Sequence, residues 1–116
     1  MSEAPTLSQA EIADRITILE LKHRHGLTDT RREVDYLMAH CRAPLAMLNR
    51  LQIANENGWE SMQAMVDHFE GRKVLCDADL LNMIRVAYER NKARVAVKNE
   101  ISAFINERQE AKSWKW

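Results

Sequence analysis

Apolar residues recur along the chain at spacings of three and four, which predicts helices, and no segment shows the alternation of a half-buried strand. The first helix is expected between Ser8 and Gly26, because Ser8 and Glu11 form a capping box and Gly26 is a natural stop. Its apolar residues fall on two nearly opposite sides, with Ile12, Ile16 and Leu19 on one and Ile18 and Leu21 on the other. Such a helix is expected to lie between two neighbours.

A second apolar stripe begins near residues 28–30. It runs through Val34, Met38, Cys41, Leu45, Leu48, Gln52 and Asn55. The stripe keeps its phase across Pro44, so the pattern predicts one long helix with a kink where proline removes the hydrogen bond to the His40 carbonyl. Asn57-Gly58 is expected to end that helix.

The rest of the chain predicts a short third helix over residues 59–69, a loop over 70–76, and a last helix. Asp77 or Asp79 can cap this last helix, which is expected to reach about Gln109. The predicted fold is all-α, an antiparallel bundle of two long helices, one of them Pro-kinked, plus two shorter helices. We expect one domain over residues 1–116, with a flexible N-terminus (1–7) and a C-terminal tail (110–116).

The charge balance, the cysteine content and the absence of a long apolar run each argue against a class of protein. Lys plus Arg equals Asp plus Glu at 17 each, which argues against charge-driven binding to nucleic acid. Cys41 and Cys76 are too few for a disulfide framework. No signal peptide and no apolar run of about 18 residues is present, so the sequence predicts a cytoplasmic protein without a membrane span.

The candidate site is a line of polar residues on the apolar side of the last helix: Tyr88, Asn91, Arg94 and Lys98. Burying a guanidinium and an ammonium without a partner costs several kcal/mol. Either an acidic neighbour or an anionic ligand is therefore expected there. From the first helix, Asp14, Thr17 and Lys22 could complete a pocket, and Arg50 could line its opposite wall.

Two interpretations of this line remain open. Arg and Lys suit phosphate or carboxylate, Asn reads a polar edge and Tyr stacks, which together favour a nucleotide-like anion. Alternatively, Asp14, Glu20 or Glu33 closes a buried polar network that serves packing. Neither interpretation involves a metal or another cofactor, because the four histidines lack metal-ligand spacing and no Gly-rich phosphate loop is present.

Two stretches together resemble a known family. They are the run DRITILELK over residues 14–22 and the run YERNKARVAVK over residues 88–98. Both are similar to motifs in an uncharacterised family of short all-helical proteins of bacteria and tailed phages, often found near polysaccharide or glycosyltransferase genes. The resemblance implies an all-helical fold and supports the candidate site residues, and it assigns no reaction.

Three functions follow as hypotheses. The leading one is non-enzymatic binding, or sequestration, of a small anionic nucleotide-like ligand in a cationic helical pocket. A second is a structural or interaction subunit of a larger assembly. A third is a chorismate-mutase-like enzyme, since the run EIADRI over residues 11–16 is superficially similar to that family's first helix. The absence of a catalytic constellation favours a binding protein over an enzyme, and a last helix of about thirty residues favours a homo-oligomer.

Overall fold

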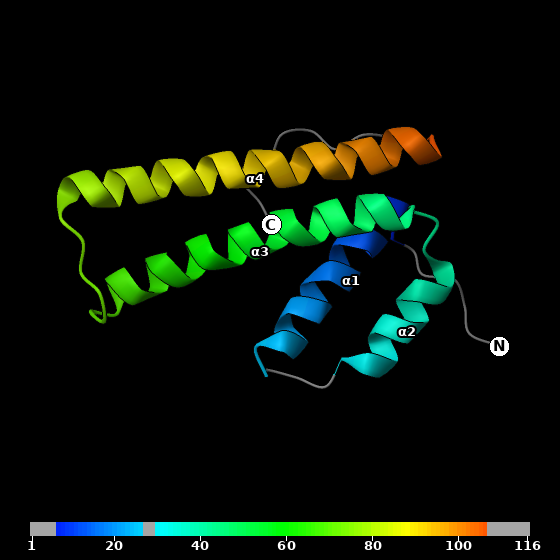
Figure 1. The fold of residues 1–116 in the computed structure, drawn as a ribbon, viewed down its shortest axis with the longest axis horizontal. Helices are drawn as coiled ribbons and strands as arrows, with labels where there is room; N and C mark the ends of the chain where they lie inside the picture. Colours follow the sequence, from blue (N-terminus) through cyan, green and yellow to red (C-terminus); the bar gives the residue numbers. More distant parts are fainter. Residues whose placement is uncertain (1–6, 27–29, 107–116) are drawn as a thin grey trace.

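A computed structural model describes residues 7–26 and 30–106, and within these ranges the protein consists of helices without strands (Figure 1). The helices are α1 (Gln9–Arg24), α2 (Arg31–His40), α3 (Leu45–Phe69) and α4 (Asp77–Ile105). The all-α prediction is confirmed in the described part of the chain, where the two long helices are α3 and α4 rather than the predicted Pro-kinked helix and the last helix. The predicted N-terminal segment, apart from Leu7, and the tail over 110–116 lie outside the described residues.

Both ends of α1 agree with the sequence signals. The Ser8 side chain accepts a hydrogen bond from the Glu11 main-chain N–H at 3.1 Å. After the helix ends, Gly26 adopts a positive φ of 69°, a conformation that suits glycine. The predicted neighbours on two sides are also present. Ile12, Ile16 and Leu19 pack against Val34 and Leu37 of α2, whereas Ala10 and Ala13 pack against α3 and α4.

The predicted single helix kinked at Pro44 is wrong. Instead, α2 ends at His40, residues 41–44 form a connection, and Pro44 is the N-cap of α3. A proline disfavours helical backbone in the residue before it, so the chain leaves the helix rather than bending within it. The side chain of Gln9 stabilises this connection by donating to the His40 carbonyl at 2.9 Å and accepting from the Arg42 N–H at 2.6 Å.

The predicted stop at Asn57-Gly58 is also wrong, because α3 continues through both residues to Phe69. Glycine in a helix costs only about 1 kcal/mol relative to alanine. Packing outweighs that cost here: Gly58 is buried, and the Asn57 carbonyl accepts a hydrogen bond from Arg90 of α4 at 2.9 Å.

The start of α4 agrees with the predicted region, although Cys76 rather than an aspartate is the N-cap and makes no side-chain capping bond. The helix ends at Ile105, where Asn106 adopts the left-handed conformation. The predicted end near Gln109 lies outside the described residues.

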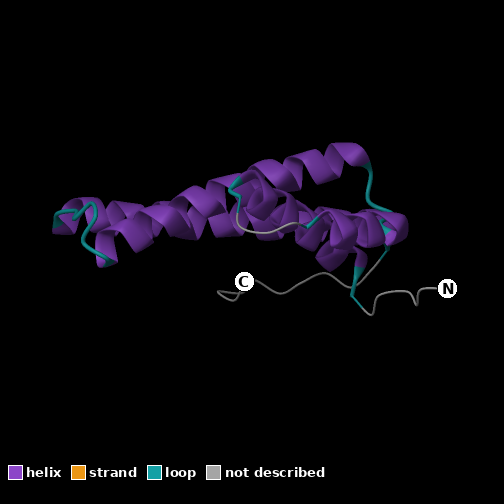
Figure 2. Ribbon diagram, turned by 90° about the horizontal axis from the view of Figure 1, so that it is seen from below, coloured by secondary structure: helices purple, strands orange, loops and turns teal. Residues whose placement is uncertain are grey.

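The helices α3 and α4 form a long hairpin. We call the end of this hairpin where α1 and α2 lie the base. α3 and α4 lie antiparallel and side by side, and α1 and α2 gather near one end of this hairpin (Figures 1 and 2). α1 contacts both hairpin helices, whereas α2 packs against α1. The loop over residues 70–76 forms the opposite end, which we call the tip.

Candidate functional site

Asp14 of α1 is the centre of a buried polar cluster between α1, α3 and α4. Its carboxylate accepts two hydrogen bonds from Arg94, from Nε to Oδ1 at 3.1 Å and from Nη2 to Oδ2 at 2.5 Å. This is the two-point geometry in which a planar guanidinium matches a planar carboxylate. Arg94 is only 3% exposed, so the carboxylate compensates a charge that water does not reach.

Asn55 of α3 brings a third helix into the cluster. Its Nδ2 donates to Asp14 Oδ1 at 3.0 Å and to Thr17 Oγ1 at 2.6 Å. Thr17 Oγ1 in turn donates to the main-chain carbonyl of Asp14 at 2.8 Å. These bonds tie α1, α3 and α4 together at one buried point.

Lys98 lies one turn after Arg94 on α4. Its Nζ is 3.8 Å from Asp14 Oδ2, a distance that marks a charge–charge contact rather than a hydrogen bond. Lys98 is buried, and Asn91 is buried on the same side of the helix. We use the name Asp14 cluster for Asp14, Thr17, Asn55, Arg94 and Lys98.

Helical spacing explains why most of this cluster can be foreseen. Asp14 and Thr17 are three residues apart on one side of α1, and Arg94 and Lys98 are four apart on α4, so each pair shares a face. Sequence analysis did not single out Asn55 as a site residue. Its signal is an amide at a position of the α3 stripe where apolar residues otherwise repeat.

Four predicted site residues lie outside the Asp14 cluster: Asn91 is buried on α4, and the other three lie on the surface. Tyr88 is 37% exposed, with Lys92 Nζ 5.4 Å from the centre of its ring. Lys22 is exposed in the last turn of α1. Arg50 is exposed on α3 and pairs with Glu100 of α4. The structure thus brings four predicted residues onto one point and leaves these three on the surface.

The pair between Arg50 and Glu100 has its own electrostatic effect. Arg50 Nη2 donates to Glu100 Oε1 at 3.0 Å, and Nη1 donates to the other carboxylate oxygen. These bonds favour both charged forms, so the pKa of Glu100 lies below its usual value and the pKa of Arg50 lies above its own. Both side chains are exposed, and their role is to link the two hairpin helices at the surface.

A different feature runs along the face of the hairpin on which α1 lies. Two stripes of residues follow the three-and-four spacing of a heptad repeat without interruption. On α3 the stripe is Leu48, Leu51, Asn55, Gly58, Met62, Met65 and Phe69. On α4 it is Leu81, Ile84, Tyr88, Asn91, Val95, Lys98 and Ser102. We call these fourteen positions the hairpin seam.

Exposure changes abruptly along the hairpin seam. Every seam residue up to Gly58 on α3, and from Asn91 onward on α4, is buried. Towards the tip, Met62 is 48% exposed and Phe69 71% on α3, and Leu81 is 68% and Ile84 48% on α4. We call the part of the seam at Met62, Met65, Phe69, Leu81, Ile84 and Tyr88 its open half.

The boundary of the open half coincides with the end of α1. Arg24, the last residue of α1, pairs with Glu56 of α3. The ring of the next residue, His25, stacks on Trp59 with centroids 4.6 Å apart. The first open position, Met62, lies three residues further along α3. The seam is therefore buried where α1 covers it and exposed beyond the reach of α1.

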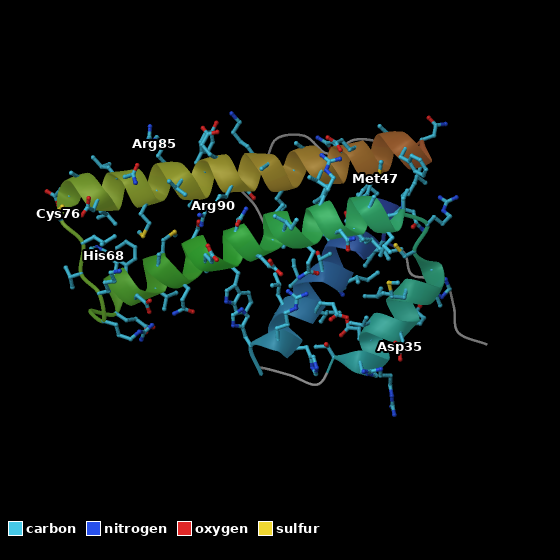
Figure 3. The ribbon with its side chains drawn as sticks, viewed as in Figure 1. Asp35, Met47, His68, Cys76, Arg85 and Arg90 are labelled. Atoms are coloured by element: carbon cyan, nitrogen blue, oxygen red, sulfur yellow. The ribbon has the colours of Figure 1, made fainter. Side chains whose placement is uncertain are left out.

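Hydrogen bonds support the hairpin beyond the boundary. Arg90 of α4 lies between the two helices and donates to the Asn57 carbonyl and, at 3.0 Å, to Ser61 Oγ (Figure 3). At the tip, the Asp67 carbonyl accepts from the N–H groups of Arg72 and Lys73 at 2.8 and 3.0 Å. The tip is therefore hydrogen-bonded, although Phe69, Val74 and Leu81 are each about 70% exposed there.

The described residues contain neither a metal-binding group nor a membrane-spanning helix. Within residues 7–26 and 30–106, no group of three or more His, Cys, Asp or Glu side chains could hold a metal ion. Among the helices described above, none has the length and apolar character needed to cross a bilayer. Comparison of the chain with family models, curated proteins and solved structures finds no match.

Proposed function

We propose that this chain is a non-enzymatic interaction subunit whose open half binds an apolar helical surface of a protein. The observation that carries the proposal is the change from buried to exposed along one uninterrupted seam. Single exposed apolar residues are normal on a protein surface. A continuous row of them at heptad spacing, extending a stripe that a helix already covers, is typical of a surface that packs against another helix.

The Asp14 cluster supports this proposal as the anchor of the base. It holds α1 against α3 and α4 and thereby fixes where the covered part of the seam ends. Removing α1 from the hairpin would break the hydrogen bonds of Arg94 and Asn55 to Asp14 and expose the apolar cluster that Ala10 and Ala13 share with α3 and α4, which makes that separation unfavourable. The base is therefore the stable part, and the open half is the part that offers new contacts.

Site-specific photocrosslinking tests the proposal. Benzoylphenylalanine would replace Phe69, which is 71% exposed in the open half, or Phe104, which is 60% exposed elsewhere on α4 and serves as the matched control. Photolysis in an extract of cells that make the protein is expected to give one dominant adduct at position 69. Peptide mass spectrometry should map its partner to an amphipathic helix. No adduct, or equal adducts at both positions, would reject the proposal.

Binding of a small anionic, nucleotide-like ligand at the Asp14 cluster is a second candidate function. It is supported by the convergence of Arg94 and Lys98 on one carboxylate, and by two buried atoms on the covered part of the seam. Asn55 Oδ1 and Ser102 Oγ have no hydrogen-bond partner among the described residues. A thermal-shift panel of mono-, di- and cyclic nucleotides and sugar nucleotides tests it. A selective stabilisation that Lys98→Met abolishes would support it, and no response to any of them would reject it.

A further inference from the structure

We infer that the partner of the open half is a second copy of this chain, bound about a two-fold axis with the two bases at opposite ends. This inference rests on the proposed function and names its partner.

The open half is suited to pair with itself. It consists of two antiparallel helical segments, residues 62–69 on α3 and 81–88 on α4, of equal length. Each spans about 12 Å at 1.5 Å per residue. Two such faces placed against each other form a four-helix bundle, in which heptad seams are closed from all sides. A contact of this kind is isologous, so one patch serves both copies.

The position of α1 decides how the copies are arranged. α1 lies on the same face of the hairpin as the open half, because its Asp14 contacts the seam residues Asn55 of α3 and Lys98 of α4. If both bases lay at the same end, the two α1 helices would meet and hold the open halves apart. With the bases at opposite ends, the tip of each copy instead follows the end of the partner's α1 along the seam. Only this arrangement lets the open halves touch.

The apolar area of the open half is large enough for a small specific interface between two copies. A large apolar side chain exposes about 100 Å² when fully accessible. Of the six open-half residues, Phe69 and Leu81 are about 70% exposed and the others are half exposed or less, so they present roughly 300 Å² in each copy. Two copies together would bury about 600 Å², close to the apolar share of about 700 Å² in a small specific interface of about 1,200 Å².

Charges along α4 favour the same arrangement. The helix begins with Asp77 and Asp79 and carries Arg85 and Lys92 beside the open half. Arg85 lies on the side of α4 that faces away from α3 (Figure 3). When the α4 helices of two copies run antiparallel with Ile84 near the two-fold axis, Asp77 of one copy lies beside Lys92 of the other. Within its own helix Lys92 also pairs with Glu89 at 3.9 Å.

Sedimentation equilibrium of the purified full chain tests the inference. The wild type is expected to dimerise, and Leu81→Gln should weaken dimerisation at least tenfold. Leu45→Gln is the matched control, because Leu45 is 69% exposed and Leu81 is 68%, but Leu45 lies at the base. Circular dichroism confirms that both variants fold. A monomeric wild type, or equal effects of the two substitutions, would overturn the inference.

A charge exchange tests the arrangement without removing apolar surface. Lys92→Glu and Asp77→Lys should each raise the dimer dissociation constant by about tenfold, since each changes two symmetric pairs. Combining both substitutions should restore it. In a Cys76→Ser background, Ile84→Cys should form a disulfide-linked dimer, and Phe104→Cys should not. Loss of dimerisation in the double variant, or no disulfide at position 84, would contradict the antiparallel arrangement.

These results also separate the inference from the proposed function. If the purified chain is monomeric but the crosslinker at position 69 captures a helix of a different protein, the second-copy inference is wrong and the interaction function stands. If neither dimer nor crosslink forms, both are wrong. If the crosslinked partner peptide comes from the chain's own open half, both are supported by independent measurements.

Discussion

At the scale of single residues, Asp14 connects more helices than any other side chain described above. It belongs to α1, and its carboxylate accepts hydrogen bonds from Arg94 of α4 and Asn55 of α3. The consequences of losing such a group are asymmetric. Without Asp14, the two cations remain buried and lose the carboxylate that compensates them, which costs more than the bonds themselves.

We therefore expect Asp14→Leu to lower the free energy of unfolding by about 3–5 kcal/mol, the usual effect of breaking a buried ion pair. Urea denaturation monitored by circular dichroism measures this effect. Glu33→Gln is the control, because Glu33 pairs with Arg15 at 3.9 Å on the surface. Surface pairs contribute about 1 kcal/mol or less. A loss of less than 1 kcal/mol for Asp14→Leu would mean that the cluster does not anchor the base.

The surface ion pair between Arg50 and Glu100 predicts how the stability of the fold depends on pH. Because Arg50 holds the pKa of Glu100 below 4.5, the pair stabilises the fold above the unfolded pKa. This contribution disappears as the pH falls through the lower folded pKa. Carbon-13 NMR titration should show that Arg50→Gln returns the pKa of Glu100 towards 4.5.

Asp67 is the internal control for that titration. Hydrogen bonds from Arg72, the stronger effect, and from Gln63 hold the pKa of Asp67 below 3.8. The Arg50→Gln substitution alters neither donor. The titration of Asp67 should therefore stay where it is. A shift of both carboxylates together would point to a general change in the fold rather than to the loss of one pair.

At the scale of elements, the connection between α2 and α3 depends on a residue of α1. The Gln9 amide donates to the last carbonyl of α2 and accepts from an N–H in the connection. It acts as a bridge between a helix end and an extended segment, two places where the main chain lacks its own partners. The chain can therefore leave the helix at residues 41–44 and still satisfy these main-chain groups.

Gln9→Ala should destabilise the protein by about 1–2 kcal/mol through the loss of both bonds. Gln9→Glu should cost less, because its carboxylate can still accept from the Arg42 N–H. Thermal and urea unfolding of the two variants measure the difference. Gln63→Ala, which removes an exposed bond to Asp67, is the control and should change stability by less than about 0.5 kcal/mol. Equal losses for Gln9→Ala and Gln63→Ala would contradict this role.

Sequence patterns predicted the elements better than their ends. Apolar periodicity identified the helical segments of the chain, but it joined α2 to the first half of α3 and made the second half of α3 a separate helix. It could not decide between a kink and a break at Pro44, because a stripe keeps its phase by chance across a four-residue connection. It also misjudged Asn57-Gly58, where contacts from Arg90 and burial outweigh weak local preferences.

The candidate site was predictable to the extent that its residues share a helix face. The positions of Arg94 and Lys98 in an apolar stripe indicated burial, and Asp14 was foreseen as an acidic partner. Asn55 was missed, because its role depends on which turn of α3 lies opposite Asp14. That register is set by packing between the helices, so the sequence of neither helix alone predicts it.

At the scale of the whole molecule, the shape is elongated. The principal extents are 52, 30 and 22 Å, and the radius of gyration is 15.7 Å, whereas a compact chain of this length has about 13 Å. The length comes from a hairpin that reaches beyond its base. A two-helix extension with apolar residues on its open face gains stability when that face is covered.

Thermal unfolding should therefore depend on protein concentration. The unfolding midpoint of the wild type is expected to rise by several degrees over a hundredfold increase in concentration, since association stabilises the folded state by mass action. Differential scanning calorimetry measures this rise. The Leu45→Gln control should keep the dependence and Leu81→Gln should lose it. A midpoint independent of concentration in the wild type would show that the hairpin needs no second copy.

The base and the tip lie at opposite ends of the hairpin, so the length of its two helices sets the distance between them. Its two helices share a seven-residue repeat, and a turn at Gly71, with φ of 78°, reverses the chain far from α1 and α2. Inserting seven residues into each helix near the tip would move the loop outward by about 10 Å and keep every seam position in register. Inserting two residues into one helix alone would turn its apolar stripe by about 200°, to the opposite side of the helix. The reach of this molecule can therefore change in steps of a heptad, while the base that anchors it stays the same.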